Sequence, residues 1–239
     1  MLYFFMKGVI SMKKIICLLL ILVMLTGLCG CFGGQEVEDI RGDIVDGNTI
    51  PDTQPQEEEP EFSMGKATEN TYRNDFLGIS CTLPEQWAFY SDEQILQMNK
   101  YVGTVIDEDV AQQLKDAAII YDMCAVNEAE GYSINVNLEK LNALQLIGLD
   151  IKQNLEAQID TILSSYESMG YTDTTVTYAK IQVDGQEFDG LKLYGKIQGL
   201  DFFLEVFTFR KGSYLANVTV SSFETGQNET ILSYFTIDE

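Results

Sequence analysis

Carboxylates, thiols and aromatic rings are the side chains of this chain that could do chemistry. The chain has 37 acidic residues and no histidine. Histidine is the commonest general base and the commonest metal ligand, so its absence excludes Ser-His-Asp and Cys-His catalysis and the HExxH zinc motif. Neither a Walker sequence nor GxGxxG occurs, and Ser80 lacks the second glycine of GxSxG. We therefore expect no enzymatic activity and no cofactor.

Cys81 and Cys124 are the two thiols that follow Cys31 in the sequence. Outside the cell they could form a disulfide, closing a loop of about 43 residues and stabilising the fold by about 4 kcal/mol. They could equally be small buried apolar side chains. A redox-active thiol is less favoured, because the chain has no CxxC motif.

Two groups of carboxylates could act as the acid pair of a glycan hydrolase. These are Asp107-Glu108-Asp109 and the pair Glu128 and Glu130. Such enzymes hold two carboxyl groups about 5 Å or about 6.5–9.5 Å apart, a separation that sequence does not reveal. Acids in solvated loops or at helix starts are the favoured interpretation. A carboxylate-only hydrolase is therefore the last of the alternatives.

Aromatic side chains could line a surface that binds sugar or peptide. Aromatic rings at these spacings more often belong to a hydrophobic core, and we favour that interpretation. The residues concerned are Trp87, Tyr90, Tyr101, Tyr121, Tyr132, Tyr194 and Tyr214.

Helices and strands must hold these side chains in position, and the sequence pattern predicts where those elements lie. Ile79, Cys81 and Leu83 alternate with polar residues, which predicts a half-buried strand. Ser91 and Gln94 form a capping-box pattern at a helix start. The predicted order is the strand at 79–83, helices at 92–101 and 107–117, and strands at 118–126 and 132–139 with a turn at Gly131.

The second half begins with a long amphipathic helix at 151–169, which Asp150 caps and Gly170 ends. An antiparallel meander follows, and Asp184-Gly185 predicts a type I′ hairpin turn. The strand at 201–209 is apolar on both faces and so needs cover on both sides. The predicted strands are 174–183, 186–197, 201–209 and 213–222, followed by a helix within 226–235. This pattern indicates an α+β fold, a largely antiparallel sheet flanked by helices.

The run from Asn74 to Trp87, NDFLGISCTLPEQW, resembles the opening strand of PsbP/Mog1-like domains, including LpqN-type bacterial lipoproteins. In those domains a glycine-hydrophobic strand ends in a proline and a tryptophan follows closely. The later order of helix, meander and helix is similar too. The resemblance implies an α/β/α sandwich over residues 70–239. It also implies roles in interaction and assembly, with no shared catalytic residues.

The N-terminus has the pattern of a bacterial export signal. Lys13 and Lys14 precede the apolar run 15–28, which is too short to span about 30 Å of hydrocarbon comfortably. Leu28-Cys29-Gly30-Cys31 then resembles a lipobox. This resemblance implies that 1–31 is a signal peptide with lipobox, and that Cys31 receives a diacylglycerol and becomes the first mature residue. An uncleaved N-terminal helix is the alternative.

The segment after the anchor is strongly acidic. Residues 32–69 contain 11 acids, two bases and three prolines, which predicts a disordered tether before a single domain at 70–239. Beyond residue 31 the chain has 12 basic and 37 acidic residues, a net charge of −25. Such a charge repels phosphate backbones, so we expect no nucleic-acid partner.

Together these features predict a lipid-anchored protein on the outer face of the cell membrane. Its domain is expected to be a non-catalytic interaction module for an unidentified envelope or extracellular protein. A small-molecule or lipid carrier is the first alternative, and it would need an apolar pocket between sheet and helices.

Overall fold

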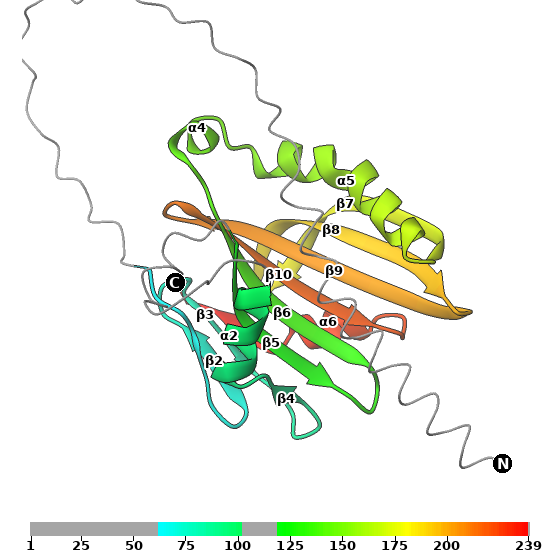
Figure 1. Ribbon diagram of the computed structural model, residues 1–239, viewed down its shortest axis with the longest axis horizontal. Helices are drawn as coiled ribbons and strands as arrows, with labels where there is room; N and C mark the ends of the chain where they lie inside the picture. The colour runs from blue at the N-terminus through cyan, green and yellow to red at the C-terminus, as the bar shows by residue number, and fades with distance from the viewer. Residues whose placement is uncertain (1–61, 102–118, 239) are drawn as a thin grey trace, which may run out of the picture.

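The computed structural model describes residues 62–101 and 119–238 (Figure 1). The predicted signal peptide, the lipid-attachment residue Cys31 and residues 32–61 of the predicted tether lie outside this part. So do the predicted helix at 107–117 and its acids Asp107-Glu108-Asp109.

A large sheet of seven strands forms the middle of the molecule, and all its pairings are antiparallel. In the β7–β8 turn, Asp184 and Gly185 have φ of 49° and 75°, which confirms the predicted type I′ hairpin. The strands, in spatial order, are β4 (Ala88–Phe89), β5 (Ile119–Asn127), β6 (Tyr132–Lys140), β10 (Tyr214–Ser222), β9 (Leu200–Lys211), β8 (Gln186–Ile197) and β7 (Thr172–Val183).

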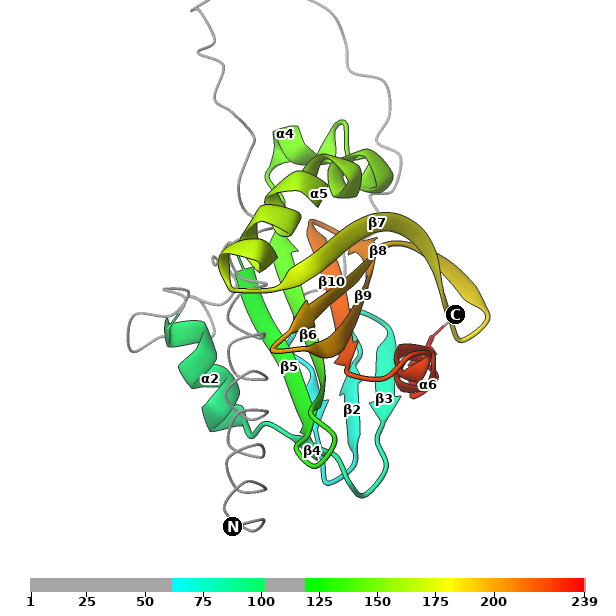
Figure 2. The same ribbon diagram turned by 90° about the vertical axis from the view of Figure 1, so that its right-hand side faces the viewer.

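A small four-stranded sheet lies against one face of the large sheet (Figure 2). Its order is β1 (Lys66–Ala67), β2 (Thr71–Asn74), β3 (Ile79–Thr82) and β11 (Phe235–Ile237). β1 pairs with β2, and Phe62 and Met64 pack against the core between the sheets. The domain therefore begins before residue 70. The predicted boundary at residue 70 is too late, because Phe62 and Met64 are apolar residues of the acidic segment that pack, partly buried, against the core.

Helices cover the other face of the large sheet and one end of the core. α5 (Ile151–Ser168) lies over β7 and β8, and α2 (Asp92–Tyr101) packs on β5 (Figures 1 and 2). The short α4 (Ala143–Leu146) joins β6 to α5, and α6 (Gln227–Leu232) contacts β10 and β9. The predicted fold class is confirmed as α+β. The second sheet, α4 and β11 were not predicted.

Strand alternation divides the apolar residues of β9 between two cores. Phe202, Leu204 and Val206 belong to the cluster beneath α5, while Phe207 belongs to the cluster between the two sheets. The predicted cover on both sides of this strand is thus present. In the part of the chain that the structure describes, no helix has the length and apolar character needed to cross a membrane.

Candidate functional site

A polar row crosses the helix-side face of the large sheet. Backbone register places its six residues opposite one another on six successive strands from β5 to β7. Apolar clusters flank the row beneath α5 and beneath α2. The row consists of Tyr121, Asn137, Asn217, Thr208, Asp189 and Lys180.

Uncharged side chains occupy the middle of the polar row and are hydrogen-bonded in sequence. Thr208 Oγ1 donates to Asn217 Oδ1 at 2.8 Å, and Asn217 Nδ2 donates to Asn137 Oδ1 at 3.3 Å. Asn137 Nδ2 in turn lies 3.4 Å from Oδ1 of Asn135, two residues away on β6. Thr208 and Asn217 are each only 1% exposed, so these polar groups lie inside the fold.

The middle of the row has more hydrogen-bonding capacity than it uses. Asn135, Asn137 and Asn217 carry six side-chain N–H donors, and two of these donate to a neighbouring asparagine. The row can therefore offer amide donors and acceptors to another molecule that carries no charge.

The outer end of the polar row is charged. Lys180 Nζ lies 2.8 Å from Asp189 Oδ1, and the Tyr178 hydroxyl donates to the same carboxylate. Partial burial acts to raise the pKa of Asp189. The hydrogen bonds from Lys180 and Tyr178 outweigh that effect, and the pKa lies below its ordinary value. Asp189 is therefore a stable anion.

Asp122 is a buried carboxylate on the opposite face of the large sheet, at a bulge in β5. Asn74 Nδ2 donates to its Oδ2 at 2.7 Å, the Tyr72 hydroxyl donates to the same oxygen, and Gly65 N donates to Oδ1 at 2.8 Å. Burial raises the pKa of Asp122 despite these hydrogen bonds. We call these four residues the Asp122 cluster.

Gly65 is required in the Asp122 cluster because the space around it is filled. A Cβ on Gly65 would lie 2.3 Å from Tyr72 Cε2 and 2.8 Å from Asp122 Oδ2. The cluster therefore connects the segment before β1 to β2 and β5. In the sequence, the signal for this cluster is the single acid within the apolar run IIYDMCAVN.

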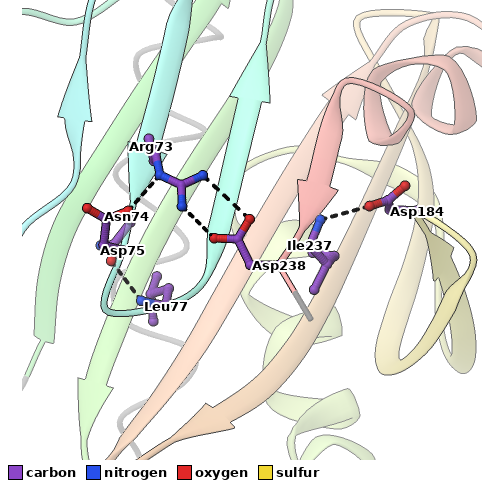
Figure 3. A network of polar contacts seen from close by, with 7 residues as sticks. All are labelled: Arg73, Asn74, Asp75, Leu77, Asp184, Ile237 and Asp238. Carbon is purple, nitrogen blue, oxygen red and sulfur yellow. Dashed lines mark hydrogen bonds and ion pairs between the residues drawn. The ribbon is translucent and has the colours of Figure 1, made fainter. Parts of the chain in front are cut away.

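A third polar network holds the C-terminal strand in place (Figure 3). Arg73 forms ion pairs with Asp75 at 2.6 Å and with Asp238 at 2.7 Å. The backbone N–H of Ile237 donates to Asp184 in the β7–β8 turn at 2.9 Å. Arg73 and Asp75 are largely exposed, which indicates a structural surface network.

Cys81 and Cys124 are both buried and both free, so the disulfide alternative is wrong. Cys81 belongs to the core between the sheets, whereas Cys124 belongs to the cluster beneath α2. The large sheet separates these two clusters, which keeps the thiols apart. Burial raises the pKa of Cys81 to about 12, so its reactive thiolate is scarce at neutral pH.

The other predicted site residues do not assemble into a catalytic centre. Glu128 and Glu130 are exposed in the β5–β6 turn. Among residues 62–101 and 119–238, no three histidine, cysteine, aspartate or glutamate side chains are grouped as metal ligands would be. The aromatic residues that are buried, as the core interpretation predicted, are Trp87, Tyr121, Tyr132 and Tyr214. Tyr90 and Tyr194 are half-buried.

Comparison with known proteins gives only distant structural similarity. No protein family and no curated protein matches the chain. A solved structure from Bacteroides thetaiotaomicron is 9% identical, with 72% of this chain aligned to 49% of that one and a TM-score of 0.36. LpqN, described as involved in cell envelope biogenesis of Mycobacterium tuberculosis, is 10% identical, with 67% of this chain aligned to 83% of LpqN and a TM-score of 0.32. The chain spans about half the length of the Bacteroides protein. Similarity at this level carries no functional assignment.

Proposed function

We propose that this protein is a lipid-anchored extracytoplasmic lipoprotein with a PsbP/Mog1-like domain, which acts as a non-catalytic binding module. Its partner is an uncharged peptide segment of another envelope protein, bound along the polar row. The observation that carries this proposal is the unused hydrogen-bonding capacity of Asn135, Asn137 and Asn217 inside the fold.

The composition of the polar row supports a role in recognition. Apolar side chains of similar volume at these positions would stabilise the fold at least as well as a buried polar network with unused donors. Positions that break the local rule of apolar packing are expected at functional sites. The row lies between two apolar clusters, and its outer end reaches the surface, where the Lys180 side chain is 45% exposed.

The chemistry of the row indicates the class of ligand. An asparagine side chain carries the same amide group as the peptide backbone, so it can both donate to and accept from a peptide unit. Aliphatic residues on both sides of the row, such as Leu191 and Ile95, suit the side chains of a bound peptide. The absence of a charge at Asn137, Asn217 and Thr208 favours an uncharged segment.

Binding can be tested by NMR on the mature chain carrying Cys31→Ser, which keeps it in solution. Uncharged decapeptides rich in Leu, Asn and Ser would be added, and the side-chain amide resonances of Asn135, Asn137 and Asn217 followed. These should shift, while that of Asn99, whose side chain already pairs with the Tyr121 backbone at 2.8 Å and 2.9 Å, should not.

The matched variants are Asn217→Leu in the polar row and Asn127→Leu outside it, since both asparagines are buried. Peptide-induced shifts at Asn135 and Asn137 should be lost in the first and kept in the second. Shifts with neutral oligosaccharides in place of peptides, or no shift with either, would refute the proposed ligand class.

The anchor at Cys31 is a separate part of the proposal. Two acyl chains on one residue hold a protein stably at a membrane. Cys31→Ser should therefore release the protein from the membrane fraction, and mass spectrometry of the mature wild type should find a diacylated N-terminus. Cys29→Ser is the matched control and should remain membrane-bound.

One observation favours a second candidate, a carrier of a small molecule. The Tyr166 hydroxyl and the Thr174 hydroxyl are buried at the α5 side of the sheet, and neither has a hydrogen-bond partner within the described residues. Tyr166 lies among the rings of Tyr171 and Phe202. A carried molecule with an apolar body and one polar group would suit this cluster. Native mass spectrometry of the Cys31→Ser chain should then find a bound small molecule.

A further inference from the structure

α4 projects from the end of β6 (Figures 1 and 2). Leu144 is 84% exposed and Ile147 is 82% exposed, while Leu146 and Leu149 are half-buried. No charged residue occurs in 141–149. A soluble surface rarely presents several large aliphatic side chains together without a function.

The conformation of α4 is held by its own capping box. Asn142 Oδ1 accepts hydrogen bonds from the backbone N–H groups of Leu144 and Gln145, both at 3.0 Å. Gln145 Oε1 accepts from the backbone N–H of Asn142 at 2.8 Å. The exposed leucine and isoleucine are therefore presented by an ordered turn of helix.

Basic residues lie at the base of this projection. Backbone register places Tyr214 opposite both Lys140 and Lys211, and the N–H of Leu141 donates to Ser213 O at 2.8 Å. Arg210 is adjacent in β9, and its Nε donates to Gly212 O. Segments 139–152 and 209–214 together contain four basic and two acidic residues, although the chain beyond residue 31 has a net charge of −25.

Two acids lie among these basic residues. Burial raises the pKa of Glu139, which lies at the end of β6. Asp150 is the N-cap of α5, where its Oδ1 accepts from Gln153 N at 3.0 Å. The nearby Asp238 is already paired with Arg73.

The described chain also begins at this end of the molecule. Phe62 stacks on Tyr214 with ring centroids 5.0 Å apart. Tyr214 is the residue that lies opposite Lys140 and Lys211. The sequence leading from Cys31 therefore joins the domain beside the base of α4.

We propose that α4 inserts Leu144 and Ile147 into the outer leaflet of a membrane that contains anionic phospholipid, with Arg210 and Lys211 facing the headgroups. This second contact goes beyond binding at the polar row. It fixes the orientation of a domain that the lipid anchor alone would leave free to rotate. The acidic remainder of the domain is repelled from the same surface and so faces away.

A lipid surface fits α4 better than a protein partner does. The feature is convex and aliphatic, and hydrocarbon accepts such a shape without a matching groove. Basic residues around an apolar tip are the pattern of elements that lie in the membrane interface. A protein partner would need a groove for Leu144 and Ile147, and anionic lipid would not be required.

Fluorescence quenching can test the insertion. The mature chain would be coupled through the Cys31 thiol to a maleimide lipid, in phosphatidylcholine vesicles with and without phosphatidylglycerol. Ile147→Trp reports on α4. Leu200→Trp is the matched control, because Leu200 is an exposed aliphatic residue, 44% exposed, in the β8–β9 hairpin. Lipids brominated on the acyl chains quench an indole that enters the hydrocarbon, and both variants share the buried Trp87 as background.

Brominated lipid should quench the Ile147→Trp variant and leave the Leu200→Trp variant unchanged. Omitting phosphatidylglycerol, or adding R210Q and K211Q, should remove this quenching. Quenching of the two variants to the same extent would overturn the insertion. Quenching of Ile147→Trp that persists without phosphatidylglycerol would overturn the part assigned to the basic residues. Because the coupling is chemical and no peptide is present, the result is independent of natural lipidation and of binding at the polar row.

Discussion

The two faces of the large sheet treat buried polar groups in opposite ways. On the face toward the small sheet, Asp122 receives hydrogen bonds from Tyr72, Asn74 and Gly65, all within the fold. On the helix-side face, three asparagines use two of their six side-chain N–H donors on one another. The hydrogen bonds of the Asp122 cluster are all made within the fold. The asparagines of the polar row keep N–H donors that could bind another molecule.

This difference separates structural polar groups from candidate functional ones. The Asp122 cluster joins residues 48–57 positions apart in the sequence and so holds the small sheet on the large one. The polar row joins strands that the sheet already pairs through their backbones. Substitutions in the Asp122 cluster should therefore lower the stability of the fold, whereas substitutions in the polar row should weaken binding.

The largest expected effect is that of Asp122→Ala. The substitution leaves the Tyr72 hydroxyl, the Asn74 amide and the Gly65 N–H buried without their acceptor. We expect the free energy of unfolding to fall by about 3–5 kcal/mol, measured by urea denaturation of the Cys31→Ser chain. A loss below about 1 kcal/mol would show that the cluster does not hold the two sheets together.

A smaller effect is expected for Asn217→Leu in the polar row. Leucine has a similar volume, and water or the remaining amide of Asn137 can replace the lost hydrogen bonds. We expect a change in the free energy of unfolding of less than about 1.5 kcal/mol, of either sign, measured in the same urea experiment. A loss as large as that of Asp122→Ala would make the polar row structural and remove the basis of the proposed binding role.

Local signals in the sequence were sufficient to predict most of the helices and strands. The capping pair Ser91 and Gln94 forms the predicted reciprocal bonds at the start of α2, at 2.8 Å and 3.3 Å. Asp150 caps α5 and Asp184-Gly185 makes the β7–β8 turn, as predicted. In each case the physical cause lies within four residues, so a single sequence reveals it.

Pairings between distant segments could not be predicted in the same way. β11 pairs with β3 across more than 150 residues, and β1 is a strand of two residues in an acidic segment. Short strands carry too little alternation to be recognised, and their partners are chosen by the three-dimensional core. The second sheet therefore appeared only in the structure.

The polar row was partly visible and was not recognised. In β6, Asn135 and Asn137 alternate with Ile134 and Val136, and β10 shows the same alternation at Asn217. Such alternation normally indicates a solvated face of an antiparallel sheet. Here the face is buried, and only the register of six strands brings the separate residues into one row.

The next prediction concerns the pH dependence of the Asp122 cluster. The pKa of Asp122 is raised in the folded state, because burial disfavours its charged form. Its favourable contribution to stability is therefore fully present below the ordinary value of 3.8 and is lost as pH rises through the raised pKa. The stability of the wild type relative to Asp122→Asn should decline as pH rises above 3.8. Urea midpoints of both proteins over a pH series measure this difference, and a difference that grows with pH would contradict it.

The smallest effect is expected at Asp189, and its sign is opposite. Hydrogen bonds from Lys180 and Tyr178 lower the pKa of Asp189, so its contribution to stability is present at neutral pH and is lost as pH falls through the lowered value. Urea midpoints over the same pH series should therefore show that the stability of the wild type relative to Asp189→Asn increases as pH rises.

This increase should be smaller in high salt, because the Lys180 side chain is 45% exposed and salt screens its ion pair with Asp189. Glu205→Gln is the matched control, since Glu205 also pairs with a lysine, Lys192 at 3.2 Å, but lies on the other face. If the relative stability rose with pH at Asp122 as well, hydrogen bonds from partners rather than burial would govern both carboxylates, and the contrast between the two faces would fail.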